Sequence, residues 1–508
     1  MLIGLAVIFA AGCASTNQFC GGVMGNDSCV SVSISPTSAI LAAGGSNQFS
    51  VKYAGSTDFL HGTTLIWKVN GIVGGNGSVG TIDSNGLYTA PAGTFSTTSV
   101  TVTAYVTTLE IQADSLVTVL GAHQVGVRPG SSGAEFNDRA SGLVFLPRGN
   151  NYIRLATQVD SNGNQTFYHS TFNVGTYDAA RADAALTAMR ANGYNAVRVF
   201  LNGCCANGIG NTAGGLSDQY LANLTDFLAR AGNQGIYVIF TSDWLPSLGG
   251  YTNQYANCTQ FADVNTLNLC AGGVAGAVSF HHDLVQGLIA HSANLRAILA
   301  YELRNEYYYA SNAAPLNLMS GTVTAADGQT YDMSDNTAKQ LMMDNGLIYF
   351  TNQVRSAIVA LDPTALVTVG FFWPQTPNPT RTGDARVISV YPAIASSSAD
   401  FVDVHGYSLP NDLTMPQLMQ NYGLTGYQEQ KPAMMGEFGA FTSDYAQAPD
   451  AATALKSWQI AGCPYNLKGW LLWTWDTDEQ PQLWNAMSTG AVINQQLAPS
   501  SRPDPCSP

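Results

Sequence analysis

Apolar and polar residues alternate in twos along the segment from Val30 to Leu120. This alternation predicts β-strands with one buried face, separated by turn clusters such as Gly44-Gly45-Ser46 and Asn85-Gly86. The apolar positions form five runs: Val30, Val32 and Ile34; Phe49 and Val51; Ile66 to Val69; Val100 and Val102; and Leu116 to Val119. Short strands at this spacing, with Trp67 in a middle run, predict a small all-β sandwich at residues 30–120.

The period changes after Leu120, and predicted helices then alternate with apolar strands as far as the C-terminal region. Helices are predicted to begin near Thr176, Ser217, Asp283, Asp335, Thr414 and Ala451. Strands are predicted at 143–146, 196–201, 236–240, 298–303, 366–371, 401–404, 433–435 and 469–475. Eight such strands predict a (β/α)8 (TIM) barrel over residues 121–508, with its chemistry on the loops after the strands. A doubly wound sheet is the alternative, although no glycine-rich dinucleotide turn follows the first strand.

The composition excludes several classes of protein. Aromatic residues make up 10% of the 508 residues and charged residues only 11%, whereas a disordered chain has few aromatics and many charges. The net charge of -14 repels phosphate backbones, so no nucleic-acid partner is expected. Abundant uncharged polar residues suit a neutral, hydroxyl-rich ligand, and we expect a monomer.

A short apolar run, Leu2 to Ala11, precedes small residues and Cys13. The run is too short to span a bilayer as a helix. It resembles a bacterial lipoprotein signal, which implies residues 1–13 as signal peptide, Cys13 as the lipidated residue and residues 14–29 as a tether. No Lys or Arg precedes Cys13, a departure that a start codon assigned too late would explain; an ordinary secretory signal is the alternative. We expect an exported protein of the bacterial cell envelope or surface, or a secreted one, that contacts the membrane only through a lipid anchor.

Eight cysteines remain besides Cys13. An even number in an exported chain suggests disulfides. Cys20 with Cys29, and Cys258 with Cys270, are close enough to close small loops, but the connectivity stays open. A zinc site is not favoured because no C-x2-C pair occurs and the histidines have no ligand-like spacing.

The segment 30–120 also resembles bacterial immunoglobulin-like (Ig-like) domains. The likeness rests on Ile34-Ser35-Pro36, on Trp67-Lys68-Val69-Asn70-Gly71 and on Gly86-Leu87-Tyr88-Thr89-Ala90-Pro91. It implies a spacer or presentation module. No cluster of charged or nucleophilic residues in this segment indicates chemistry of its own.

Two predicted barrel strands end in glutamates. The fourth ends Tyr301-Glu302-Leu303-Arg304-Asn305-Glu306, and the seventh ends Met434-Met435-Gly436-Glu437-Phe438-Gly439. Burying a carboxylate is costly without a purpose. Two carboxylates in one cleft are what glycosidic cleavage needs, one to donate a proton to the leaving oxygen and one to attack or to activate water. Glu302 and Arg304 share the face of Glu306, and we expect them to form a structural ion pair.

These strand ends resemble clan A glycoside hydrolases, and most closely glycoside hydrolase family 5, the cellulase and mannanase group. The likeness covers roughly residues 141–480. It extends to Pro147-Arg148-Gly149-Asn150-Asn151-Tyr152, Asn195-Ala196-Val197-Arg198, His405-Gly406-Tyr407 and Trp473-Thr474-Trp475. One departure is Tyr307, where the family usually has proline, which puts the local loop in doubt.

The resemblance implies Glu306 as the acid/base and Glu437 as the nucleophile of a retaining double displacement. The implied supporting residues are Asn305 at the sugar 2-hydroxyl, Arg198 and Tyr407 in contact with Glu437, His405 lining the same subsite and Trp473 as its floor. Arg198 and Tyr407 are expected to favour the ionised form of Glu437. Trp244 and Trp373 follow predicted strand ends, where indole rings stack on sugars.

The expected function is that of a retaining, endo-acting β-1,4-glycanase that cleaves cellulose, β-glucan or mannan without a metal or organic cofactor. Two alternatives stay open. One is a non-catalytic glycan-binding lipoprotein, and the other is an exo-acting or transglycosylating enzyme of the same clan.

Overall fold

A computed structural model describes residues 17–21, 28–91, 98–159, 165–201, 209–372, 385–387, 396–408, 413–424 and 430–507. Cys13, Cys204, Cys205 and Trp373 lie outside these residues. The chain forms two compact units, 1–122 and 123–508, and each is described by itself.

The N-terminal unit is built from β-sheets whose strands pair antiparallel, except for β3 with β12. Its strands are β1 (Gln18–Gly21), β2 (Ser28–Ser35), β3 (Ser38–Ala42), β4 (Ser46–Gln48), β5 (Ser50–Gly55), β6 (Leu65–Val69), β7 (Ile72–Val73), β8 (Gly75–Asn76), β9 (Gly80–Ile82), β10 (Leu87–Thr89), β11 (Thr98–Val106) and β12 (Ile111–Leu120), with the short helix η1 (Thr57–Leu60). Phe49, Trp67 and Val69 are buried in one core, as the alternation predicts. The predicted all-β unit is therefore confirmed. Strand β1 lies within residues 14–29, the segment predicted to be a tether, and pairs with β2.

The second unit is built around a nine-stranded parallel sheet in the order β24-β20-β19-β18-β15-β29-β28-β27-β25. Its strands are β15 (Arg148–Asn151), β18 (Ala196–Phe200), β19 (Tyr237–Thr241), β20 (Ile298–Glu302), β24 (Val367–Thr368), β25 (Gly370–Phe371), β27 (Val402–Tyr407), β28 (Ala433–Gly439) and β29 (Leu467–Leu472). Only Val369 separates β24 from β25, so the two are halves of one strand and the sheet closes on itself. The prediction of a parallel barrel is confirmed, and an open doubly wound sheet is excluded.

The first barrel strand is not where the apolar pattern predicts it. Leu143 and Val144 are 68% and 60% exposed, and the strand β15 begins at Arg148. The prediction was wrong because β15 has the sequence Arg-Gly-Asn-Asn and all four residues are buried. A buried strand of polar residues gives no hydrophobic signal.

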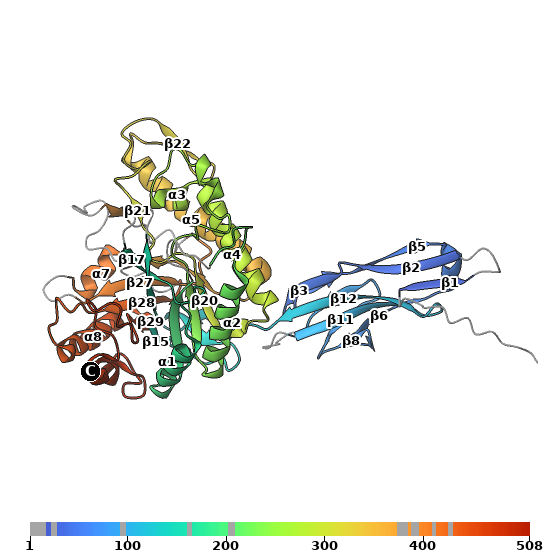
Figure 1. Cartoon of the computed structure of the whole chain (residues 1–508), viewed down its shortest axis with the longest axis horizontal. Helices are drawn as coiled ribbons and strands as arrows, with labels where there is room; N and C mark the ends of the chain where they lie inside the picture. Colours follow the sequence, from blue (N-terminus) through green and yellow to red (C-terminus); the bar gives the residue numbers. More distant parts are fainter. Residues whose placement is uncertain are drawn as a thin grey trace, which may run out of the picture. The chain divides into compact units, whose positions relative to one another are not determined.

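Helices surround the barrel strands (Figure 1). They are α1 (Ala179–Ala191), α2 (Asp218–Asn233), α3 (Val264–Leu269), α4 (Ala271–Ala290), α5 (Asn336–Leu361), α7 (Met415–Asn421), α8 (Ala448–Gly462) and α9 (Ser488–Leu497), with the short helices η2 (Asn253–Asn257), η3 (Leu295–Ala297) and η4 (Cys463–Tyr465). Among the described residues, none of these helices combines the length and apolar character needed to cross a bilayer.

Several predicted helix starts are correct, because a side chain caps the first turn there. Ser217 caps α2, and Asp335 caps α5. Asp178, rather than Thr176, caps α1. Helix α4 begins at Ala271, twelve residues before the predicted start at Asp283, because its first two turns consist mostly of alanine and glycine and carry no clear period.

A β-hairpin closes the end of the barrel where the strands begin. It consists of β13 (Val125–Gly130) and β14 (Gly133–Asp138). Val125 and Phe136 share one core cluster with Ala196, Phe401 and other residues at the N-terminal ends of the strands. The remaining short strands are β16 (Leu155–Val159), β17 (Gln165–His169), β21 (Tyr309–Ala310), β22 (Thr322–Thr324), β23 (Thr330–Asp332) and β26 (Arg386–Val387).

The C-terminal tail is fixed to the same end of the barrel. The side chain of Arg148, the first residue of β15, donates to the backbone carbonyls of Leu497, Arg502 and Pro503. Disulfides join Cys20 to Cys29 and Cys258 to Cys270, the two short pairings that the sequence allows, and a third joins Cys463 to Cys506.

Removing the long-range disulfide should destabilise the barrel unit. The bond between Cys463 and Cys506 closes 43 residues, for which the loop-entropy estimate is about 4 kcal/mol. We expect the double variant Cys463→Ser/Cys506→Ser to lower the melting temperature of this unit in calorimetry. The matched control is Cys20→Ser/Cys29→Ser, which should leave the barrel transition unchanged because that disulfide lies in the other unit. Equal melting of the barrel in all three proteins would contradict this expectation.

Candidate active site

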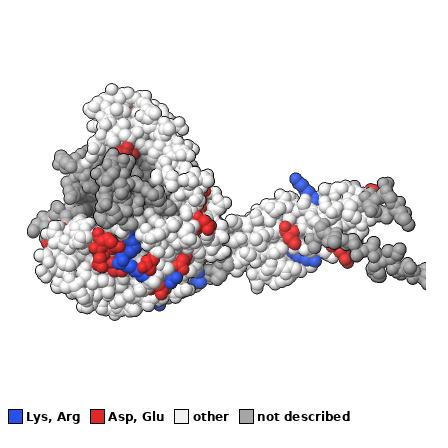
Figure 2. All heavy atoms as spheres, viewed as in Figure 1, with Lys and Arg blue, Asp and Glu red and all other residues white. Residues whose placement is uncertain are grey.

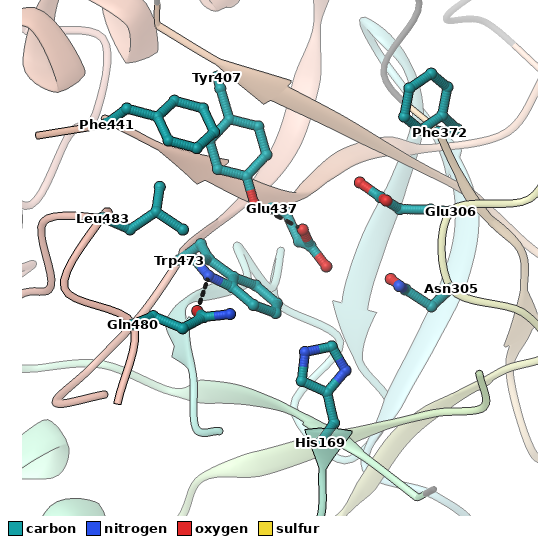
Figure 3. Close-up of a pocket in the computed structure, with 10 residues that line it drawn as sticks. All are labelled: His169, Asn305, Glu306, Phe372, Tyr407, Glu437, Phe441, Trp473, Gln480 and Leu483. Carbon is teal, nitrogen blue, oxygen red and sulfur yellow. Dashed lines mark hydrogen bonds between the residues drawn. The ribbon is translucent and has the colours of Figure 1, made fainter. Parts of the chain in front are cut away.

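A pocket of about 330 Å³ opens at the carboxyl ends of the barrel strands. Figure 3 shows Glu306 and Glu437 facing each other across it, with Asn305 beside Glu306. The lining residues are His169, Asn305, Glu306, Phe372, Tyr407, Glu437, Phe441, Trp473, Gln480 and Leu483. Five of the residues singled out in the sequence therefore meet in one cavity, although the strands that carry them are far apart in the chain.

Arg198, from the middle of β18, is fully buried and connects the carboxylates. Its Nε and Nη2 donate to Glu302 at 2.9 and 2.6 Å, and its Nη1 donates to Glu437 Oε1 at 2.6 Å. The same guanidinium reaches Asn305 Oδ1 at 2.8 Å and Asn151 Oδ1 at 3.0 Å. Burial lowers the pKa of Arg198, but the neighbouring carboxylates more than offset this, so its pKa is raised and it stays charged.

Glu437 lies in β28 and is almost completely buried. Its Oε1 accepts from Arg198, and its Oε2 accepts from the Tyr407 hydroxyl at 2.9 Å. Both donors favour the ionised form, as predicted. Burial nevertheless outweighs them and raises the pKa of Glu437 above its ordinary value, which the sequence argument did not include.

The backbone that presents Glu306 is held from both sides. The amide of Asn305 donates to Ser242 O at 2.6 Å, and the amide of Tyr307 donates to Gly370 O at 2.7 Å. Glu306 itself has φ +44°, a left-handed conformation that non-glycine residues rarely adopt and that is concentrated at functional sites. Its side chain is 32% exposed, against 4% for Glu437.

His405 is fully buried and is not among the residues that line the pocket, so the structure does not place it in the predicted subsite position. Its Nδ1 is 3.3 Å from Glu306 Oε1 and 3.5 Å from Glu437 Oε2. Burial lowers its pKa to about 4, so the ring is neutral at neutral pH.

Trp473 forms one wall of the pocket together with residues that the sequence did not indicate. Its Nε1 donates to Gln480 Oε1 at 2.8 Å, and its ring packs edge-on against His169 and Phe200. His169 comes from the hairpin of β16 and β17, which is inserted after the first barrel strand. No motif surrounds His169 or Gln480, so only the fold reveals them.

The predicted ion pair of Glu302 with Arg304 does not form. Glu302 is held by Arg198, whereas the Arg304 guanidinium contacts the backbone oxygen and the carboxylate of Asp243 and lies 4.5 Å from the Trp244 ring centre. Side chains that point into the barrel meet residues of other strands rather than of their own strand: Glu302 on β20 meets Arg198 on β18, with β19 between them. Burial raises the pKa of Asp243 to about 6, although Arg304 opposes this.

Tyr307 occupies the position where the related family usually has proline. It is fully buried, its ring packs against Phe350 and Phe371, and its hydroxyl donates to Tyr309 at 3.1 Å. Tyr307 is therefore accommodated in the core.

Two groups of side chains have the donor types of a metal site. Glu302, Asp403 and His405 form one group, and Glu306, His405 and Glu437 form the other; within each, the potential ligand atoms lie within 4.8 Å of one another. Arg198 already donates to a carboxylate in both groups. A divalent cation would have to share those oxygens with a guanidinium, so the residues do not fit a metal.

The family follows from comparison with known proteins. A sequence model described as cellulase (glycosyl hydrolase family 5) matches residues 158–479, more than half of the chain. The chain therefore belongs to glycosyl hydrolase family 5 and is a glycoside hydrolase. No curated protein is significantly similar to it in sequence.

Solved structures share this fold at low sequence identity. The exo-β-1,4-mannosidase Op5Man5 from Opitutaceae bacterium strain TAV5 has a TM-score of 0.50 and 17% identity, over 75% of this chain and 63% of its own. The match thus spans less than two thirds of that protein. The endo-1,4-β-mannanase from Rhizomucor miehei has a TM-score of 0.51 and 14% identity, over 73% of this chain and 98% of its own. At such identities the likeness concerns the fold alone.

Proposed function

We propose that the protein is a retaining β-1,4-glycanase in which Glu437 is the nucleophile and Glu306 the acid/base. The observation that carries the proposal is the distance between the two side chains. An oxygen of Glu306 and an oxygen of Glu437 lie within 4.8 Å of each other. Retaining enzymes hold their carboxyl groups about 5 to 5.5 Å apart, whereas inverting enzymes need about 6.5 to 9.5 Å to admit a water molecule.

The contacts of the two glutamates support different roles for them. Glu437 accepts from Arg198 and Tyr407, which hold an ionised carboxylate aimed into the pocket. Glu306 is the more exposed of the two, as is required of a group that first protonates a leaving oxygen and later meets water. Asn305 lies beside Glu306, where its side chain can bind the 2-hydroxyl of the bound sugar.

The reaction then proceeds in two displacements. An oxygen of Glu437 attacks the anomeric carbon while Glu306 gives its proton to the departing glycosidic oxygen, which leaves as an alcohol. The product is a glycosyl ester of Glu437. Glu306, now ionised, takes a proton from water as the water oxygen attacks the same carbon, and Glu437 leaves as a carboxylate. Two inversions give net retention.

We propose an uncharged β-1,4-linked glycan, cellulose, β-glucan or mannan, as the substrate, and an endo mode of cleavage. The face of the barrel unit seen in Figure 2 is mostly uncharged among the described residues, apart from one cluster of acidic and basic side chains and a few scattered ones, which suits a neutral polymer. Two of the similar structures are named as a mannosidase and a mannanase, one exo-acting and one endo-acting. A polysaccharide panel tests the mode: endo cleavage lowers viscosity early, whereas release of monosaccharide alone would favour the exo alternative.

We also propose that the protein is exported, and anchored through Cys13. Three disulfides among the described residues support an oxidising compartment. Radiolabelled palmitate should be incorporated into the wild type and not into Cys13→Ser when each is expressed in a bacterial host. Label in both proteins, or in neither, would contradict the anchor.

Replacing Glu306 should affect substrates according to their leaving groups. General acid catalysis contributes about 10² to 10⁴-fold, so Glu306→Ala should lose about 10³-fold in kcat/KM on the polysaccharide. On 2,4-dinitrophenyl glycosides, whose leaving group needs no proton, the loss in kcat/KM should be within about tenfold. Equal losses on both substrates would contradict the acid/base role.

A further inference from the structure

The residue before Glu437 is held by side chains of two other strands. The pairing of β27 with β28 shifts register at this point, which leaves Gly436 as an extra residue in β28. Its N–H donates to Asp403 Oδ1 at 2.6 Å, and its carbonyl accepts from Asn151 Nδ2 at 2.9 Å. A Cβ at position 436 would lie 2.0 Å from Asp403 Oδ2, so only glycine permits this approach. The backbone orientation of Glu437 therefore depends on Asp403.

The second oxygen of Asp403 has an unusual environment. Asp403 is fully buried, and no donor among the described residues makes a hydrogen bond to its Oδ2. Arg198 Nε is 3.9 Å away and is committed to Glu302. An oxygen of Asp403 and an oxygen of Glu302 lie within 4.8 Å of each other, and both side chains are fully buried. A proton on one of the two carboxyl groups removes the repulsion between them and lets that group donate to the other.

The charges around the pair determine which group holds the proton. Burial raises the pKa of Asp403 well above its ordinary value, and the Glu302 carboxylate raises it further. Burial also raises the pKa of Glu302, but Arg198 more than offsets this, so the pKa of Glu302 is lowered. The titratable groups that face Asp403 are Arg198 on β18, Glu302 on β20, His405 on β27, Glu437 on β28 and Tyr422 after α7.

We propose that Asp403 is a positioning residue that is protonated at neutral pH, donating to Glu302 while it accepts the Gly436 N–H. The inference rests on the proposed role of Glu437 as nucleophile. With Asp403 neutral, Arg198 balances two carboxylates, Glu302 and Glu437, and keeps its bond to each. Ionisation of Asp403 places a third carboxylate 3.9 Å from Arg198 Nε, which competes for the guanidinium and leaves Glu437 less well held.

Two variants distinguish the effect of the hydrogen bonds of protonated Asp403 from the effect of its side-chain volume. Asp403→Asn reproduces the protonated acid, since the amide oxygen accepts from Gly436 and the amide nitrogen donates to Glu302. Asp403→Leu fills similar space with neither bond. We expect Asp403→Asn to keep kcat/KM within about fivefold of wild type near neutral pH, and Asp403→Leu to lose about 10²-fold or more because buried partners are left unpaired.

The pH profile reports the proton itself. The substrate is 2,4-dinitrophenyl β-cellobioside or β-mannobioside, whichever the wild type cleaves faster, so that protonation by Glu306 does not limit kcat/KM. Wild-type kcat/KM should fall at alkaline pH as Asp403 ionises, and Asp403→Asn should remain active further into that range. The proposal would be overturned if Asp403→Asn were as inactive as Asp403→Leu. It would also be overturned if kcat/KM of Asp403→Asn fell at the same alkaline pH as that of the wild type.

Melting temperatures give a readout that does not depend on activity. Between the ordinary Asp pKa of 3.8 and the raised folded value, the folded wild type binds one proton more than the unfolded chain. Its stability therefore falls as pH rises through this window, and Asp403→Asn lacks that loss. The melting temperature of Asp403→Asn relative to wild type should increase from about pH 4 to about pH 8, and a constant difference would overturn the proposal.

The two sets of measurements keep this inference distinct from the proposed function. If the wild type cleaves no glycoside, or Glu437→Gly keeps its activity, the function proposal fails, while the melting temperatures still decide whether Asp403 is protonated. If Glu437 proves to be the nucleophile and the melting difference is flat, only the inference about Asp403 fails.

Discussion

Glu437→Gly should lose at least about 10⁴-fold in kcat/KM, because the variant lacks the proposed nucleophile. Added azide should then restore part of the turnover on a dinitrophenyl glycoside, since the anion fits the space of the deleted carboxylate beside Arg198 and Tyr407. One displacement replaces two, so the glycosyl azide formed should have inverted configuration. Product NMR and azide-dependent rates measure both results.

The control for this loss is Glu135→Gln in the hairpin that closes the far end of the barrel. Glu135 pairs with Arg128 there and is remote from the pocket. Its replacement should leave kcat/KM unchanged. A Glu437→Gly variant with substantial activity on the polysaccharide, or an azide product of retained configuration, would disprove the nucleophile assignment.

Arg198→Gln should impair stability and catalysis together. The variant leaves Glu302 and Glu437 buried without their cation, and breaking a buried ion pair in this way typically costs about 3 to 5 kcal/mol. Without the guanidinium the pKa of Glu437, already raised by burial, rises further. A larger fraction of Glu437 would then be protonated, and the ionised form would lose its aligning cation, so kcat/KM should fall about 10³-fold or more. Denaturant unfolding and steady-state kinetics measure the two effects.

The matched control for Arg198→Gln is Arg355→Gln. Arg355 makes a similar two-bond contact with Asp400, at 3.0 and 3.1 Å, but both side chains are partly exposed. Partly exposed pairs contribute at most about 1 kcal/mol, so this variant should be nearly as stable as the wild type and fully active. Comparable destabilisation in both variants would show that burial of Arg198 has no special consequence.

The strands of the barrel could be predicted from the sequence where they are apolar. The prediction failed where a strand is polar. The strand at 298–302 is a continuous apolar run ending in Glu302, and it lies within the predicted range. The strand β15 contains Arg148 and two asparagines, and their partners lie on distant parts of the chain: Arg148 donates to the carbonyl of Leu497, 349 residues away, and Asn151 to the carbonyl of Gly436, 285 residues away. A local pattern cannot contain such partners.

The site shows the same division. Glu306, Glu437 and Arg198 could be predicted to lie together because their neighbours match a family. The partner of Glu302 could not, since pairing across barrel strands depends on strand order and not on spacing along one strand. Likewise, His169 and Gln480 reach the pocket from insertions without a motif, and the cost of burying Glu437 becomes apparent only once its surroundings are known.

The hairpin of β13 and β14 and the C-terminal tail both act at the end of the barrel opposite the pocket. These long-range contacts, which hold the barrel together, therefore lie far from the pocket that contains the two glutamates. Loops at the pocket rim can be exchanged, lengthened or redesigned for another polysaccharide while these attachments remain intact. The loops on the pocket face can therefore change widely, in evolution or by design, as long as the contacts at the opposite end of the barrel are kept.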